Sequence, residues 1–211
     1  MRRLPVYLLI DVSGSMSGEP IKSVNDGLQL LVSALRKEPQ ALETAYLSLI
    51  TFSDVVKQVA PLTELASFKI PTLTASGGTS LGGVLSEVSS VAKKEINKGS
   101  ADEKGDWKPL VFLMTDGVPT DNVENGLRAF KDSKWGMVIA CAAGPEADTK
   151  LLQRITENVV LLDTCDSDSI KAFFRWVSSS VSVSSKKVES GAQLDNNELP
   201  PPPPELSLLK F

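Results

Sequence analysis

Two short segments of the chain are almost entirely apolar, and each is followed at once by a polar motif that contains an aspartate. Residues 4–10 precede Asp11, and residues 110–114 precede Thr115 and Asp116. A strand that is apolar on both faces is typical of a parallel sheet covered by helices on both sides. Ligands of such folds bind at the carboxyl ends of the strands. The two polar motifs are therefore expected to meet at one edge of the sheet.

The rest of the chain alternates between strand and helix patterns. Segments 45–52 and 55–61 are predicted strands joined by only Ser53 and Asp54, which indicates a hairpin with one antiparallel strand. The remaining pattern predicts helices over 19–35, 81–96, 122–131, 149–155 and 170–181 and strands over 137–143 and 159–162. The expected fold is α/β, a doubly wound, mostly parallel central sheet with one antiparallel edge strand and helices on both faces.

The pattern predicts one domain over residues 1–184 and a disordered tail over 185–211. The tail is rich in Ser, Lys, Asn and Glu and then contains five consecutive prolines, Pro200 to Pro204. Such a composition cannot bury a core, and the prolines favour the polyproline II conformation. A stiff spacer is the favoured interpretation of this segment, and a docking peptide is the alternative.

Composition excludes several classes of function. The chain has no histidine, so any metal must be held by oxygen or sulfur. A net charge of −4 without a basic patch argues against nucleic-acid binding. No apolar run is long enough to span a bilayer. The two cysteines, Cys141 and Cys165, are too few for a disulfide framework and indicate a reducing compartment.

The start of the chain loosely mimics a signal peptide, because Arg2 and Arg3 precede a short apolar run. The run is at the lower limit of length, contains Pro5, and its cleavage would remove Asp11. We therefore predict a cytoplasmic protein.

The segment after the first apolar strand carries oxygen ligands at alternate positions. Asp11 offers a carboxylate, Ser13 and Ser15 offer hydroxyls, and Gly14 lets the backbone bend between them. A hard cation such as Mg²⁺ prefers about six oxygen ligands in an octahedral arrangement. Taken alone, this motif could equally be a loop that caps a helix.

Two further motifs fall where they could join the first. Gly77-Gly78-Thr79-Ser80 precedes a predicted helix and offers the Thr79 hydroxyl, and Thr115-Asp116-Gly117 adds a second carboxylate. Each could be an ordinary turn. Their combination at the expected strand ends, in the expected order, predicts a metal site made of Asp11, Ser13, Ser15, Thr79 and Asp116.

These motifs resemble the metal-ion-dependent adhesion site of von Willebrand factor A domains. The resemblance extends over about residues 4–181, nearly the whole chain except the tail. The sequences over 8–21, 77–82 and 113–121 are most similar to the TerY-like bacterial subgroup, which is associated with tellurium-resistance and stress-response gene clusters.

The resemblance implies a role for each residue. Ser13 and Ser15 would contact the metal directly, Thr79 directly or through water, and Asp11 and Asp116 often through bridging water. The metal would be Mg²⁺, or Mn²⁺ or Ca²⁺, and an acidic side chain of a protein partner would fill the open coordination position. The subgroup also implies kinase-like and phosphatase proteins as candidate partners. The implied function is a metal-dependent protein-interaction module rather than an enzyme.

Rival functions remain open at this point. A Mg²⁺-dependent phosphohydrolase of the haloacid dehalogenase type normally has a second aspartate two residues after its nucleophile, where this chain has Ser13. A serine hydrolase would need a histidine, and a phosphate-binding loop would need a lysine that residues 77–82 lack. A structural domain with an empty site is a further alternative. Asp121 is expected to cap a helix rather than bind metal.

Overall fold

The computed structural model describes residues 2–100, 104–189 and 199–209. Within them, seven strands form one sheet in the order β3-β2-β1-β4-β5-β6-β7. The five inner strands pair in parallel, and the outermost two, β3 and β7, pair antiparallel. The strands are β1 (Leu4–Asp11), β2 (Ala45–Phe52), β3 (Val56–Glu64), β4 (Leu110–Thr115), β5 (Met137–Ala143), β6 (Val159–Leu162) and β7 (Leu206–Leu209). The predicted fold class is confirmed, with one antiparallel edge strand more than expected.

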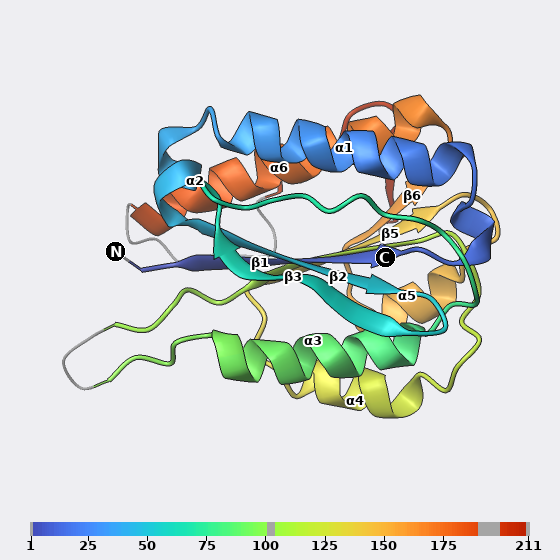
Figure 1. The fold of residues 1–211 in the computed structure, drawn as a ribbon, viewed down its shortest axis with the longest axis horizontal. Helices are drawn as coiled ribbons and strands as arrows, with labels where there is room; N and C mark the ends of the chain where they lie inside the picture. The colour runs from blue at the N-terminus through green and yellow to red at the C-terminus, as the bar shows by residue number, and fades with distance from the viewer. Residues whose placement is uncertain (1, 101–103, 190–198, 210–211) are drawn as a thin grey trace.

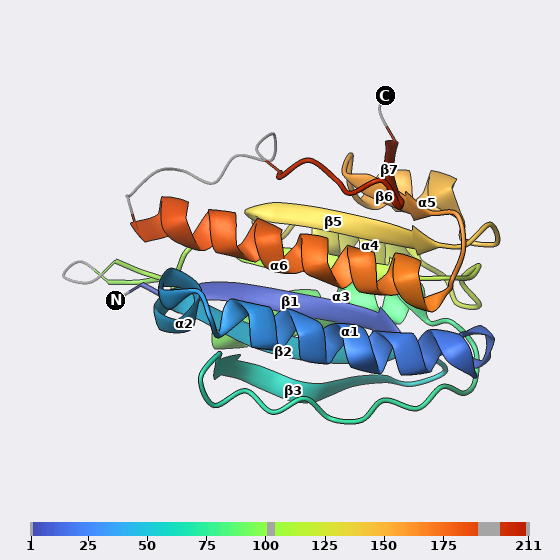
Figure 2. The same cartoon turned by 90° about the horizontal axis from the view of Figure 1, so that it is seen from above.

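Helices cover both faces of this sheet (Figure 1). One face carries α1 (Glu19–Leu35), α2 (Pro39–Thr44) and α6 (Ser167–Glu189), and the other carries α3 (Leu81–Glu95), α4 (Glu124–Lys131) and α5 (Thr149–Ile155). Seen from above, α1 and α6 lie side by side along the sheet (Figure 2). Every residue of β1 is buried, because alternate side chains enter the two separate apolar cores. This explains the all-apolar run at its start.

The central strands bring the predicted motifs to one edge of the sheet. β1 lies between β2 and β4, and Ile10 is in register with Met114. Since the two strands are parallel, Asp11 at the end of β1 lies beside Thr115 at the end of β4. A short 3₁₀ helix, η1 (Gly14–Met16), then leads into α1.

The β2–β3 hairpin has an irregular ladder. The pairing shifts register between Leu47 and Leu49 and again between Leu49 and Ile50. β3 also contains Pro61, which has no N–H to donate to a neighbouring strand. These features suit an edge strand.

The C-terminal region differs from the prediction of a disordered tail after residue 184. Helix α6 continues to Glu189, and Ser184, Ser185 and Val188 are buried. The helix pattern was missed there because small serines, rather than large apolar residues, face the interior. Residues 190–198 and 210–211 of the predicted tail lie outside the described residues.

The last described segment packs on the domain. The indole N–H of Trp176 donates a 2.8 Å hydrogen bond to the carbonyl oxygen of Pro200. Leu206 is 4% exposed and joins the core beside α6. β7 pairs with β6, with Leu208 opposite Val160. Because this pairing is made with a strand far away in sequence, the composition of the tail alone could not reveal it. Within the described residues, no helix has the length and apolar character that crossing a membrane requires.

Candidate metal centre

The loop after β1 is held in place by hydrogen bonds between its own residues and a neighbouring loop. The backbone N–H of Ser13 donates to Oδ1 of Asp11 at 2.8 Å. The N–H of Gly14 donates to the carbonyl oxygen of Gly77 at 2.8 Å. A side chain at Gly14 would place its Cβ only 3.3 Å from that same oxygen. Gly14 therefore allows the first two motifs to approach each other closely.

A second set of bonds fixes the loop that carries Thr79. The N–H of Thr79 donates to the hydroxyl of Thr120 at 3.0 Å, and the N–H of Thr120 donates to the carbonyl oxygen of Thr79 at 2.9 Å. These two bonds fix the orientation of the Thr79 backbone. The N–H of Gly78 donates to Oδ1 of Asp54 at 2.8 Å. Gly77 has a φ of 81°, a backbone conformation that favours glycine. The Gly-Gly pair thus forms the turn that presents Thr79.

The side chains of the three motifs meet at the carboxyl edge of the sheet. The hydroxyl oxygens of Ser13 and Ser15 are 3.0 Å apart, and the Ser15 hydroxyl donates to Oδ1 of Asp116 at 2.8 Å. A Cβ placed on Gly117 would lie 3.7 Å from Oγ1 of Thr79 and 3.9 Å from Oγ of Ser15. Gly117 therefore lies within van der Waals distance of both hydroxyls.

Both carboxylates of the site are buried. Asp11 is 0% exposed and Asp116 is 8% exposed. Burial raises the pKa of Asp11, although hydrogen bonds from Ser13 and Thr115 oppose the shift. Burial also raises the pKa of Asp116, and the charge of Asp11 adds to that shift, while the bond from Ser15 opposes it.

No lysine or arginine within the described residues lowers the pKa of either carboxyl. In the described part of the chain, the groups that favour their charged forms are hydroxyls and backbone amides. Two neighbouring buried carboxylates without a basic partner are costly in free energy. A cation at this edge would remove that cost.

The donor set fits a hard divalent cation. Three hydroxyls, from Ser13, Ser15 and Thr79, lie beside the two carboxylates, and all are oxygen ligands of the kind that Mg²⁺ prefers. Within the part of the chain that the structure describes, no three Asp, Glu or Cys side chains converge as a metal-binding group. A cation here would therefore depend on the hydroxyls as much as on the carboxylates.

Several supporting residues were not predicted from sequence. The hydroxyl of Thr115 donates to Oδ2 of Asp11 at 2.5 Å, and Thr120 and Asp54 position the Gly78–Thr79 backbone. Thr115 directly precedes the predicted ligand Asp116, and that adjacency is the only sequence signal for its role. Asp54 and Thr120 gave no signal, because the contacts they make are distant in sequence.

Asp121 does cap a helix, but not the one that follows it. Its carboxylate accepts from the hydroxyl of Ser80 at 2.9 Å and from the N–H groups of Gly82 and Gly83 at 3.1 and 2.8 Å. It therefore caps the start of α3 across 39 residues of sequence. This bond joins the loop after β4 to the loop that presents Thr79.

Comparisons with known proteins agree with this architecture. A family model for the von Willebrand factor type A domain matches residues 6–175. No curated protein matches the chain.

Solved structures share the fold at low sequence identity. Proximal thread matrix protein 1 from the mussel byssus, in a form with a zinc-occupied MIDAS motif, is 18% identical, with a TM-score of 0.61, over 85% of this chain and 48% of that one. A von Willebrand factor type A protein from Catenulispora acidiphila is 16% identical, with a TM-score of 0.64, over 86% and 43%. The pilus adhesin SpaC from Lactobacillus rhamnosus GG is 16% identical, with a TM-score of 0.66, over 86% and 30%.

The chain thus spans less than half the length of each of these three proteins. At such identities the likeness concerns the fold alone, whereas the family model covers most of the chain. On that match, the chain belongs to the von Willebrand factor type A domain family.

Proposed function

We propose that this chain is a metal-dependent protein-interaction module in which a bound Mg²⁺ takes its last ligand from an Asp or Glu of a protein partner. The observation that carries the proposal is the buried pair Asp11 and Asp116, which has no basic partner within the described residues and lies beside three hydroxyls. When bound, the cation would supply a strong positive centre that attracts a carboxylate.

Each residue of the site has a separate task in this proposal. Ser13, Ser15 and Thr79 would hold the cation through neutral hydroxyls, so that it keeps much of its charge. Asp11 and Asp116 would balance the remainder, often through water. Asp11 also orients the loop, because it accepts from the Ser13 N–H and the Thr115 hydroxyl.

The choice of cation and the biological setting rest on separate observations. Oxygen ligands favour Mg²⁺, with Mn²⁺ or Ca²⁺ as alternatives, and zinc occupies the MIDAS motif of the mussel protein. The motif resemblance to the TerY-like subgroup supports a role in a bacterial tellurium-resistance or stress system in the cytoplasm, with kinase-like or phosphatase proteins as partners. The adhesin among the structural neighbours supports protein binding as the general function.

A Mg²⁺-dependent phosphohydrolase is the alternative, because Asp11 lies at a strand end beside a second carboxylate. Asp11 is fully buried, and both of its oxygens accept hydrogen bonds. It is poorly placed to attack a phosphoryl group. We therefore propose that the chain is not an enzyme. Hydrolysis of p-nitrophenyl phosphate that requires Mg²⁺ and is lost in Asp11→Asn would overturn this part of the proposal.

Calorimetric titration with Mg²⁺ and Mn²⁺ tests the metal site directly. Ser15→Ala should lose most of the wild-type affinity for the metal. Ser17→Ala, which changes an exposed serine in the same loop, should keep it. Equal affinities in the two variants would contradict the proposed ligand set.

The partner step needs its own experiment. Proteins of the native host that bind the immobilised chain in Mg²⁺ should be released by EDTA and should not bind Thr79→Ala. The fold of this variant is to be checked by circular dichroism. A partner that binds equally well in EDTA would show that recognition uses another surface.

A further inference from the structure

A cavity of about 550 Å³ lies at the edge of the sheet opposite the metal centre. Its lining includes Ile96 after α3, Trp107 before β4 and Trp135 before β5. The metal-site loops follow the carboxyl ends of β1 and β4, so the two sites are separated by the length of a strand. Six residues of β4 correspond to about 20 Å. The cavity is therefore a separate feature of the molecule.

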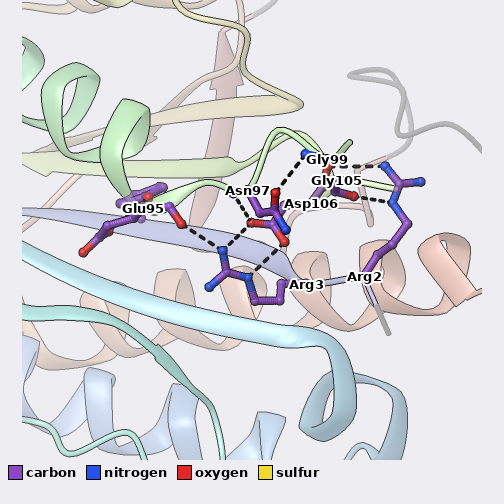
Figure 3. Close-up of polar contacts among 8 residues, drawn as sticks. Arg2, Arg3, Glu95, Asn97, Gly99, Gly105 and Asp106 are labelled. Carbon is purple, nitrogen blue, oxygen red and sulfur yellow. Dashed lines mark hydrogen bonds and ion pairs between the residues drawn. The ribbon is translucent and has the colours of Figure 1, made fainter. Parts of the chain in front are cut away.

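The indole of Trp107 is held by the N-terminal segment. The guanidinium carbon of Arg2 lies 3.7 Å from the centre of the Trp107 ring, and the backbone N–H of Trp107 donates to the carbonyl oxygen of Arg3 at 2.9 Å. Figure 3 shows the hydrogen bonds that the two arginines make with the loop before β4. Arg2 donates to the carbonyl oxygen of Gly105 at 2.6 Å, and Arg3 donates to both oxygens of Asp106 at 2.6 and 2.9 Å. One face of the Trp107 indole is therefore covered by the Arg2 guanidinium.

The indole of Trp135 is fixed independently. It stacks on Phe130, with ring centres 4.8 Å apart and an angle of 28° between the planes. Its N–H donates to the carbonyl oxygen of Phe130 at 2.8 Å. Both tryptophans are only partly buried, and both line the cavity. Two aromatic side chains held in place before binding lose little conformational freedom when a ligand contacts them.

Among the described residues, the charged side chains that line this cavity are mostly basic. Four exposed lysines line the cavity: Lys93, Lys98, Lys108 and Lys134. Of the two acidic residues in the described lining, Asp106 is bound by Arg3 and by the Asn97 N–H, and Asp132 is exposed. The chain as a whole has a net charge of −4, so this basic rim runs against the average of the molecule.

We propose that the cavity binds a small aromatic anion, with the ring against Trp107 and Trp135 and the anionic group among the lysines. The volume lies within the range of about 300–1,000 Å³ that is usual for small-molecule sites. Aromatic rings pack favourably on indoles, and the lysines supply charge complementary to a carboxylate or sulfonate. The site is independent of the metal centre, so the module would bind a partner at one edge and this ligand at the other.

The full chain, labelled with ¹⁵N and saturated with Mg²⁺, provides the test, with 2-naphthoate as the probe. The three tryptophans give three indole N–H signals, which Trp→Phe variants assign. The signals of Trp107 and Trp135 should shift in a saturable way. The signal of Trp176, which is bonded to Pro200 beside α6, should not. Neutral 2-naphthamide should bind several-fold more weakly, and acetate should cause no saturable shift.

Matched charge reversals test the role of the lysines. Lys93→Glu combined with Lys134→Glu should raise the Kd for 2-naphthoate about tenfold, since one exposed ion pair contributes up to about fivefold. Lys94→Glu combined with Lys22→Glu changes the net charge equally at exposed residues outside the cavity, and should leave the Kd within about twofold of the wild type. Equal shifts of all three indoles, no saturation, or the same loss in both double variants would overturn the proposal.

Discussion

The hydroxyl of Thr115 donates a 2.5 Å hydrogen bond to Oδ2 of Asp11, across 104 residues of sequence and between the carboxyl ends of two neighbouring strands. The other carboxylate oxygen accepts from the Ser13 N–H, so both oxygens of Asp11 are held by the protein. Asp11 is therefore fixed in orientation before any cation arrives. At the proposed metal site, Thr115 would therefore act on a bound cation through Asp11.

Replacing Thr115 tests this positioning role. Thr115→Val keeps the shape of the side chain but removes the hydroxyl, and should weaken Mg²⁺ binding about tenfold or more, as loss of a residue that orients a ligand commonly does. Thr115→Ser keeps the hydroxyl and should stay close to the wild type. Calorimetry measures both. Equal affinities in the Val and Ser variants would show that the bond to Asp11 has no effect on the cation.

The raised pKa values of Asp11 and Asp116 predict how stability depends on pH without metal. The unfolded chain loses protons from its carboxyls near pH 4, but burial keeps these two protonated to higher pH in the folded state. The folded state thus binds more protons in that interval. The free energy of unfolding should therefore fall as pH rises from about 4 through the folded-state pKa values of these groups.

Asp116→Asn should separate stability from metal binding. The Ser15 hydroxyl can still donate to the amide oxygen, and one buried charge is gone. In EDTA at neutral pH, the Tm of this variant should equal or exceed that of the wild type. Mg²⁺ at a hundred times its Kd should stabilise the wild type by about 2.7 kcal/mol, which is roughly 5–10 °C in Tm for a domain of this size, and should leave the variant unchanged. A large loss of stability in EDTA would mean that Asp116 supports the fold itself.

The thiol of Cys165 offers a chemical readout of the same carboxylate. Burial, with the charges of Asp116 and Asp166, raises the pKa of Cys165 to about 11. At pH 8 its alkylation by iodoacetamide should be slower than that of a free thiol by roughly a hundredfold or more. Bound Mg²⁺ would offset the charge of Asp116, lower this pKa and speed the reaction.

Two controls define the Cys165 experiment. Asp116→Asn should speed alkylation without metal and make it insensitive to Mg²⁺. Cys141 is 0% exposed, and burial raises its pKa well above the usual value, so it should stay unreactive throughout. A rate that Mg²⁺ does not change in the wild type would place the cation away from Asp116.

Ser185 and Ser180 form a matched pair within α6. Among the residues that the structure describes, the buried Ser185 hydroxyl has no hydrogen-bond partner, whereas the buried Ser180 hydroxyl donates to the Trp176 carbonyl oxygen at 2.9 Å. Ser185→Ala should stabilise the protein by about 0.5–1.5 kcal/mol, because it removes an unsatisfied polar group and favours the helix. Ser180→Ala should be neutral or destabilising. Urea unfolding of both variants decides the matter, and equal changes would argue against the difference in their hydroxyls.

The sequence predicted the strands and motifs that depend on local pattern. The apolar runs that end at Asp11 and Thr115 identified β1 and β4, and parallel pairing predicted that their polar ends would meet. The end of α6 was missed because Ser184 and Ser185 look polar but are buried. β7 was missed because Leu206–Leu209 becomes a strand only by pairing with β6. In the same way, Asp121 caps a helix that no local pattern could connect to it.

The two outer strands determine how easily the sheet could pair edge to edge with the sheet of another copy of the chain. β3 carries Pro61, Lys57 and a ladder with shifted register, and β7 is only four residues long. Neither presents a long, flat row of unpaired N–H and C=O groups, which is the template on which sheets join edge to edge into aggregates. Without β7, the more apolar strand β6, Val-Val-Leu-Leu, would be left as the edge. The small final strand therefore covers an apolar edge of the sheet as well as completing the fold.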